Sequence, residues 1–140
     1  MSIQTVLLPL FVEVALTFVL LYWTAHLRTS ALQAGEVRLR DIALREPNWP
    51  PRATQVANAF QNQLELPVLF YVLTILAWIT RHADLLFVVM AWVFVASRLV
   101  QVYIHVTGND VRQRGLAFGV GALVLTIMWA IFMIRILLGI

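Results

Sequence analysis

The sequence predicts an all-α membrane protein, a bundle of four transmembrane helices, and its composition and hydropathy pattern are the observations that predict it. Of the 140 residues, 61% are hydrophobic and 12% are charged. A soluble domain of this length has too little interior to bury so much apolar surface. Four continuous apolar runs account for the excess, and each reaches the ~20 residues that a helix needs to cross a bilayer. Because the runs do not alternate over short segments, they exclude a transmembrane β-barrel.

The four expected spans form a single domain, residues 1–140. They cover residues 5–27, 54–80, 85–106 and 112–139. The first span carries Glu13 well inside its apolar run. A carboxyl group at that depth must be protonated, be paired or face a wet crevice. We expect it to form a buried hydrogen bond to a neighbouring helix rather than to take part in catalysis.

The second span begins as a polar helix and continues as an apolar one. Polar residues recur at helical spacing on one of its faces, and we call this set the polar stripe: Arg52, Gln55, Asn58, Asn62 and Glu65. The stripe runs into the membrane, where polar side chains are costly unless they meet partners or line a cavity. Pro67 removes one backbone donor, so we expect a kink near residues 63–65 that opens space around the end of the stripe.

The third span is an antiparallel neighbour of the second, because only residues 81–84 connect them. Arg98, Gln101 and His105 share one face of its second half. At a rise of ~1.5 Å per residue, Arg98 and Glu65 lie at comparable depths in the two spans. We therefore expect an ion pair between these two residues, either within one chain or between subunits.

The fourth span follows a turn that contains Gly and Asn. Small residues near its start, at positions 115, 119, 121 and 122, allow the backbone of a neighbouring helix to approach closely. Arg135 lies near the other end of the span. We expect its long side chain to reach the membrane surface as an anchor.

The distribution of arginine predicts the orientation of the chain. All 10 cationic residues are arginines. The first loop holds Arg28, Arg38, Arg40, Arg45 and Arg52, the second holds Arg81, and the third holds Arg112 and Arg114. By the positive-inside rule, the first and third loops lie in the cytoplasm and both termini lie on the opposite side. Arg38 and Arg40 fit either phospholipid anchors or ligand contacts, and we favour anchors.

The residue types exclude several classes of function. The chain has no cysteine, which excludes disulfides, thiolate metal sites and a cysteine nucleophile. The three histidines are scattered, and no pair has the spacing of metal ligands. The arginines lie mostly in loops and at helix ends rather than in one basic patch, so we expect no nucleic-acid partner.

A motif in the second span resembles a known family. Asn62-Gln-Leu-Glu65-Leu-Pro67 is similar to the Asn-x-x-Glu-x-x-Pro-type signature of the MAPEG proteins, the membrane-associated proteins in eicosanoid and glutathione metabolism, with the proline one position closer. The later series of Arg98, Arg114, Phe118 and Gly121 is similar to the family's pattern in the third and fourth spans. The resemblance covers nearly the whole chain and points to a divergent, bacterial-type member.

The resemblance implies a homotrimer of four-helix subunits whose second span lines the central axis. It also implies glutathione as the cofactor, bound between neighbouring subunits near the cytoplasmic face. Arginines of the family hold the glutathione carboxylates and favour the thiolate, and a lipophilic substrate arrives from the bilayer. On this basis the expected catalytic residues are Arg98 and Arg114. The expected ligand-binding residues are Arg52, Gln55, Asn58, Asn62, Glu65, Gln101, His105 and Arg112.

The chain departs from the family's pattern within the expected site. Enzymatic members usually have an arginine where this chain has Asn58. Prostaglandin-synthase-like members have a histidine and then a tyrosine where this chain has Gln101 and His105. Arg52, on the same helical face, is a candidate substitute for the missing arginine.

Three functions are compatible with these patterns. The first is a glutathione-dependent transferase or peroxidase acting on lipophilic compounds. The second is a non-enzymatic trimeric membrane protein whose polar stripe clamps subunits or binds a lipid or small anion, since polar groups in membrane bundles often join helices. The third is a small transporter that relays ions through Glu13, Glu65 and Arg98, although the chain lacks the broken-helix repeats typical of transporters.

Overall fold

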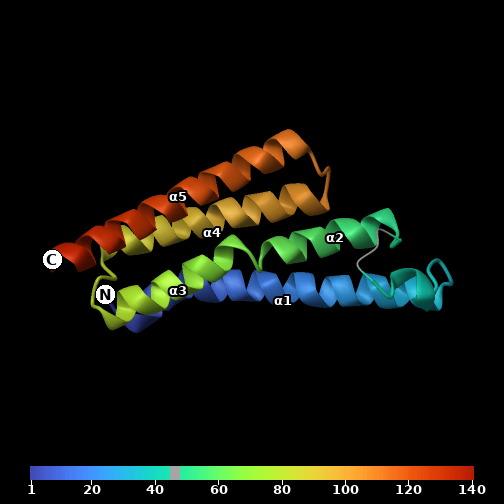
Figure 1. Cartoon of the computed structure of the whole chain (residues 1–140), viewed down its shortest axis with the longest axis horizontal. Coiled ribbons are helices and arrows are strands. Elements are labelled where there is room, and N and C mark those ends of the chain that lie inside the picture. Colours follow the sequence, from blue (N-terminus) through green and yellow to red (C-terminus); the bar gives the residue numbers. More distant parts are fainter. Residues whose placement is uncertain (45–47) are drawn as a thin grey trace.

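The computed structural model is an all-helical bundle that describes residues 1–44 and 48–140. Its elements are α1 (Ile3–Gln33), the 3₁₀ helix η1 (Leu39–Ile42), α2 (Pro51–Asn62), α3 (Leu66–Ile79), α4 (Leu85–Val106) and α5 (Val111–Leu138). Figure 1 shows the long helices lying roughly along one axis, with both termini at the same end. Arg45, counted above among the arginines of the first loop, lies outside the described residues.

Four stretches of the chain are long and apolar enough to cross a membrane. These are α1, with 31 residues, the combined α2 and α3, with 29, α4, with 22, and α5, with 28. The expected fold class is therefore confirmed: the chain is an integral, multi-pass membrane protein of four spans. The first helix continues past the end of its apolar run at Leu27 to Gln33, so its last turns extend towards the first loop.

Polar side chains cap the N-termini of three helices. The hydroxyl of Ser2 caps α1, the carboxylate of Asp84 caps α4 and the carboxylate of Asp110 caps α5. Each accepts a hydrogen bond from a backbone N–H in the first turn. Such caps satisfy donors that have no partner within the helix. The last helix ends at Gly139, whose φ of 72° lies in the left-handed region that favours glycine.

The second span is broken rather than continuous. Its first half, α2, ends at Asn62, and its second half, α3, begins at Leu66. Glu65, between them, has φ −102° and ψ −102°, outside the helical region. Pro67 lies in the first turn of α3, where its missing N–H is tolerated. The kink expected near residues 63–65 is therefore confirmed, and the break frees carbonyl groups at the end of α2 for other donors.

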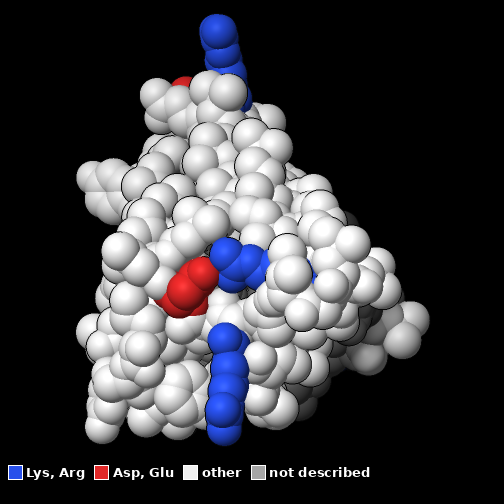
Figure 2. All heavy atoms as spheres, turned by 90° about the vertical axis from the view of Figure 1, so that its left-hand side faces the viewer, with Lys and Arg blue, Asp and Glu red and all other residues white. Residues whose placement is uncertain are grey.

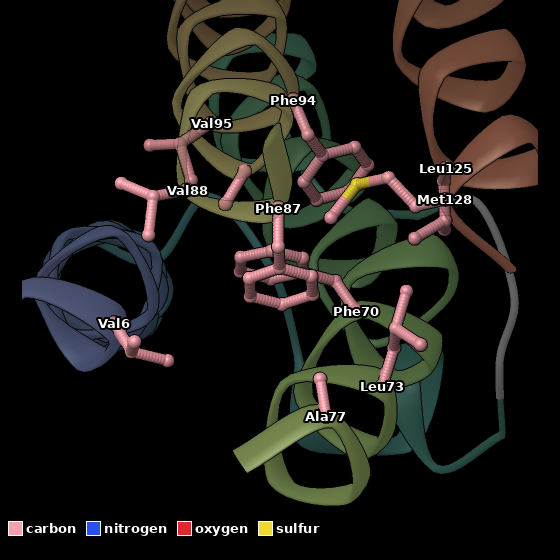
Figure 3. Close-up of a cluster of buried hydrophobic side chains, with 11 residues drawn as sticks. Val6, Phe70, Leu73, Ala77, Phe87, Val88, Phe94, Val95, Leu125 and Met128 are labelled. Atoms are coloured by element: carbon pink, nitrogen blue, oxygen red, sulfur yellow. The ribbon is translucent and has the colours of Figure 1, made fainter. Parts of the chain in front are cut away.

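The core is apolar and lies among α3, α4 and α5, with α1 at its edge (Figure 3). The rings of Phe70 and Phe94 pack with their centroids 4.9 Å apart, and Leu125 and Met128 of α5 belong to the same buried cluster. A second cluster around Val56 joins α1, α2 and α4. The two clusters hold the broken second span against its neighbours on both sides of the break.

A glycine allows close packing of α5 on α4. A Cβ atom added to Gly121 would lie 2.7 Å from the Ser97 hydroxyl of α4. A Cβ atom added to Gly115 or Gly119 would meet no atom within 4 Å. Of the small residues expected to allow close approach, these two therefore have no such role within one chain.

Arg135 ties the end of α5 to the start of α4. Its Nη1 lies 2.8 Å from Oδ2 of Asp84, so the residue expected to be an anchor at the membrane surface forms an ion pair. Figure 2 views this end of the bundle, where acidic and basic groups lie side by side on a largely uncharged surface. Burial raises the pKa of Asp84, but the hydrogen bond from the Phe87 N–H and the hydrogen bond and charge of Arg135 outweigh it and lower the pKa.

Candidate functional site

The first two residues of the polar stripe cap the end of α4. Arg52 donates a hydrogen bond to the carbonyl of Val106, and its guanidinium carbon lies 5.0 Å from the ring centroid of Trp23 in α1. Nε2 of Gln55 donates to the carbonyls of His105, at 2.7 Å, and Thr107, at 3.0 Å. The last carbonyls of an α-helix have no partner within it. These two side chains therefore satisfy α4 and tie it to α2.

The rest of the polar stripe faces an open cleft between α2, α4 and α5. This polar cleft has a volume of about 460 Å³. The lining residues are Asn58, Gln61, Asn62, Glu65, Gln101, His105, Val111, Arg114, Gly115 and Phe118. Because it includes the end of α4 and the start of α5, the polar cleft lies at the end of the bundle that carries the third loop.

His105 and Asn62 contact each other in the wall of the polar cleft. Nδ1 of His105 lies 3.4 Å from Nδ2 of Asn62. Since the amide nitrogen can only donate, Nδ1 accepts and the ring proton of the neutral imidazole lies on Nε2. His105 is buried and lies near the positive charges of Arg98 and Arg114. The imidazole therefore presents its remaining N–H as a donor.

Arg98 lies behind the wall of the polar cleft rather than in its lining. The residue is 1% exposed. One Nη donates to Oε1 of Gln101, and the other donates to the backbone carbonyl of Asn62 at 3.1 Å. Because α2 ends at Asn62, this carbonyl has no i+4 partner. It accepts only a long bond of 3.4 Å from the Glu65 N–H, which leaves a lone pair for Arg98. Arg98 thus holds two members of the wall in place.

The expected ion pair between Arg98 and Glu65 is absent among the described residues. The ion pair in direct contact there is that of Arg135 with Asp84. The expectation treated the second span as one continuous helix. The break at residues 63–65 instead places Glu65 in the lining of the polar cleft and presents a carbonyl to Arg98. Glu65 still attracts Arg98 electrostatically. A pair between subunits stays a prediction.

The buried hydrogen bond expected for Glu13 is also absent. The residue is 0% exposed, and neither of its carboxylate oxygens has a hydrogen-bond partner among the described residues. Within its own helix, the Thr17 hydroxyl donates to the backbone carbonyl of Glu13 rather than to its side chain. Sequence spacing placed the carboxyl group inside the bundle but could not specify which group of a neighbouring helix would face it.

Two neighbouring arginines at the start of α5 have different positions. Arg114 lines the polar cleft, and its Nη1 donates to Oδ1 of Asn109 at 2.7 Å. Arg112 is exposed and is not part of the lining. Of the two arginines, only Arg114 lines the polar cleft. Substitutions at Arg112 can therefore serve as controls for substitutions at Arg114.

Several lining residues were not expected from the sequence. Gln61 follows Asn58 by three residues and precedes Glu65 by four, so helical spacing alone could have added it to the polar stripe. Phe118 belongs to the pattern in the fourth span quoted above, but it carried no expected role in the site. Val111 is an apolar residue at the start of a helix, and nothing in its type or spacing indicates a binding site.

The polar cleft can hold a polar molecule that carries charges of both signs. Arg114 supplies a positive charge and Glu65 a negative one. Side-chain amides and the imidazole of His105 supply further donors and acceptors. Phe118 and Val111 add an apolar side. Such a mixture of a few polar groups with apolar walls is typical of small-molecule sites.

Comparison with known proteins identifies the family. The model of the MAPEG family matches residues 6–134, a range that contains the whole polar cleft. No curated protein and no solved structure matches the chain. Because the match covers nearly the entire sequence, the chain belongs to the MAPEG family.

Proposed function

We propose that this chain is a glutathione-dependent transferase or peroxidase that acts on lipophilic compounds and binds the thiol in the polar cleft. The observation that carries the proposal is the position of Arg114, which brings a guanidinium into an open cleft lined by amides, a carboxylate and an imidazole. Family membership supports it as well, since the MAPEG family includes enzymes of this kind.

The polar cleft fits the chemistry of glutathione. Its volume of about 460 Å³ lies within the ~300–1,000 Å³ common for small-molecule sites. Glutathione carries two carboxylates, an ammonium group and a thiol. Arg114 is suited to a carboxylate or thiolate, Glu65 to the ammonium group, and the amides of Asn58 and Gln61 to the peptide groups.

Arg114 and His105 would favour the thiolate. A free thiol has a pKa of ~8.5 and reacts only as its anion. The positive charge of Arg114 and the Nε2–H of His105 would stabilise that anion and so lower the thiol pKa. Because the polar cleft is open, the released proton can pass directly to water. Glutathione, when bound, supplies the nucleophile, while the chain orients and ionises it.

A lipophilic partner would reach the same place from the bilayer. Phe118 and Val111 provide the apolar part of the lining. The outer face of α5 exposes Leu116, Val120 and Leu123, as expected for a surface in contact with lipid or with another subunit. Apolar electrophiles concentrate in such an environment and would meet the thiolate at the edge of the polar cleft.

We further propose that the chain forms a homotrimer in which a neighbouring subunit closes the open side of the polar cleft. The first and third loops would face the cytoplasm, in agreement with the arginine count. Because the chain has no cysteine, Gly108→Cys and Ser2→Cys can be labelled singly in vesicles of known orientation. An impermeant maleimide applied from the cytoplasmic side should label the first and spare the second. Native mass spectrometry in detergent measures the subunit number.

A matched pair of variants tests the activity. Purified protein should bind glutathione and conjugate it to an aryl halide. Arg114→Gln should lower kcat/KM about tenfold or more and move the pH–rate profile to higher pH. The loss of a charged hydrogen bond destabilises the thiolate and so raises the pKa of the bound thiol. The control Arg112→Gln should leave both unchanged. Equal behaviour of the two variants, or no binding of glutathione by the wild type, would contradict the proposal.

A second candidate is a non-enzymatic trimer that holds a lipid or a small anion. The capping of α4 by Arg52 and Gln55 favours it, because these stripe residues join helices rather than face the cleft. Asn58 also favours this alternative, because enzymatic relatives usually have an arginine at this position. Purified protein that retains a phospholipid, binds no glutathione and shows no thiol-dependent turnover would establish this alternative.

A further inference from the structure

Glu13 and Arg98 are ionisable residues buried inside the bundle. They are 0% and 1% exposed, respectively. At ~1.5 Å per residue, Glu13 lies ~15 Å beyond the first residue of α1, within the first span. Its two oxygens and the Nε of Arg98 have no hydrogen-bond partner among the described residues. A charge so placed is costly unless an opposite charge or hydrogen-bonding groups compensate it.

The two residues compensate each other across the contact between α1 and α4. Val6 of α1 shares a buried cluster with Val88 and Val95 of α4, and Leu20 shares another with Val102. Glu13 and Arg98 therefore lie at similar depths along the packed helices. They form no direct ion pair in the described part of the chain, but they attract each other electrostatically. Glu65 and Tyr71 also interact electrostatically with Arg98. Glu65 opens onto the polar cleft, where solvent screens its charge, and a tyrosine is uncharged at neutral pH. Glu13 is therefore the principal counter-charge of Arg98.

We infer that Glu13 is a positioning residue of the polar cleft, acting through Arg98. The carboxylate of Glu13 stabilises the buried guanidinium through its charge, without direct contact, and the guanidinium holds the Gln101 side chain and the Asn62 carbonyl. Both of these residues line the polar cleft. The effect on ligand binding rests on the proposed function, whereas the charge pair does not.

This arrangement separates the roles of the two arginines. Arg98 is balanced from behind by the charge of Glu13 in α1, and its two Nη atoms donate to protein groups. Arg114 faces the polar cleft directly. Glu13 and Arg98 should therefore set the shape of the site and the affinity for glutathione, while Arg114 sets the ionisation of the thiol.

A double-mutant cycle tests the inference. Glu13→Gln, Arg98→Met and the double variant are compared with the wild type, and Glu36→Gln is the control because that glutamate is exposed in the first loop. Three quantities are measured in detergent: the unfolding midpoint without glutathione, and KM and kcat with it. Glu13→Gln should raise KM for glutathione about tenfold, with a smaller change in kcat and no shift of the pH–rate profile. The double variant should be impaired less than the product of the two single effects.

The outcomes decide between the possibilities. Single effects that simply multiply in the double variant, in both unfolding and KM, would overturn the charge pair. A shift of the pH profile by Glu13→Gln as large as that by Arg114→Gln would overturn the positioning role. If the wild type does not use glutathione, the proposed function fails, and the unfolding cycle still decides whether the pair exists. If Glu13→Gln does not fold, the cycle is repeated with Glu13→Asp and Arg98→Lys under the same criterion.

Discussion

The Ser97 hydroxyl of α4 lies 2.7 Å from the position that a Cβ atom on Gly121 of α5 would occupy. The same hydroxyl donates a hydrogen bond to the Phe94 carbonyl at 2.6 Å. Gly121→Ala should therefore force the hydroxyl to rotate and lose this bond, destabilising the bundle by about 1 kcal/mol. Gly119→Ala, which meets no atom within 4 Å, should be neutral or stabilising. Unfolding midpoints in detergent measure both, and equal midpoints would contradict the close approach.

The ion pair between Asp84 and Arg135 predicts a dependence of stability on pH. The pKa of Asp84 is lowered from its usual value of 3.8, so its contribution is present above about pH 4 and is lost as the pH falls through the folded-state pKa. Asp84→Asn keeps an acceptor for the Phe87 N–H but removes the charge. It should lower stability at pH 7 by about 0.2–1 kcal/mol, because the pair is partly exposed, and have less effect at pH 3.

The unfolding midpoint, followed from pH 7 to pH 3 for the wild type and Asp84→Asn, measures this effect. The two curves should converge at low pH. A constant difference between them would show that the charge of Asp84 does not contribute. Asp84→Ala should be less stable than Asp84→Asn at every pH, because it also removes the helix cap.

The capping of α4 predicts that Gln55 contributes to stability rather than to chemistry. Gln55→Ala removes the donor to the carbonyls of His105 and Thr107, and should destabilise the protein by about 1 kcal/mol. Gln61→Ala, on the exposed side of the same helix, is the control and should leave the unfolding midpoint unchanged. If Gln55→Ala leaves the midpoint unchanged but weakens glutathione binding, the residue is a ligand contact and the capping role is wrong.

Replacing Asn58 with arginine should strengthen the binding of glutathione. The residue is exposed and lines the polar cleft, at the position where enzymatic relatives usually have an arginine. Asn58→Arg should lower KM for glutathione about tenfold, since a charged hydrogen bond to a carboxylate replaces a neutral one. Gln33→Arg, at the exposed end of α1, controls for the added charge. Steady-state kinetics with varied glutathione measures KM, and equal KM values of the two variants would contradict the prediction.

The fold could be predicted because its cause is visible along the chain. Continuous apolar runs determine the spans, since a membrane crossing must satisfy its backbone within each helix. Pro67 determines the break for an equally local reason. Helical spacing also predicts that Asn58 and Asn62 share a face, and both line the polar cleft.

The partners of the charged residues could not be predicted, because they depend on groups that only the folded bundle exposes. The family resemblance assigned Arg52 to a ligand, yet the Val106 carbonyl at the end of α4 accepts its hydrogen bond. Spacing paired Arg98 with Glu65 by depth, yet the break freed the Asn62 carbonyl at that point. In both cases a backbone oxygen near the end of a helix accepts a hydrogen bond from the guanidinium. The pattern of side chains alone does not record such oxygens.

The interruption of the second span also has a mechanical consequence. A continuous helix transmits rotation from one end to the other, whereas the non-helical residues between α2 and α3 can absorb it. The apolar half packs in its own cluster with α4 and α5, and the polar half is fastened to the end of α4. Each half can therefore follow the direction that its own neighbours impose, without turning the side chains of Asn58 and Asn62 away from the polar cleft.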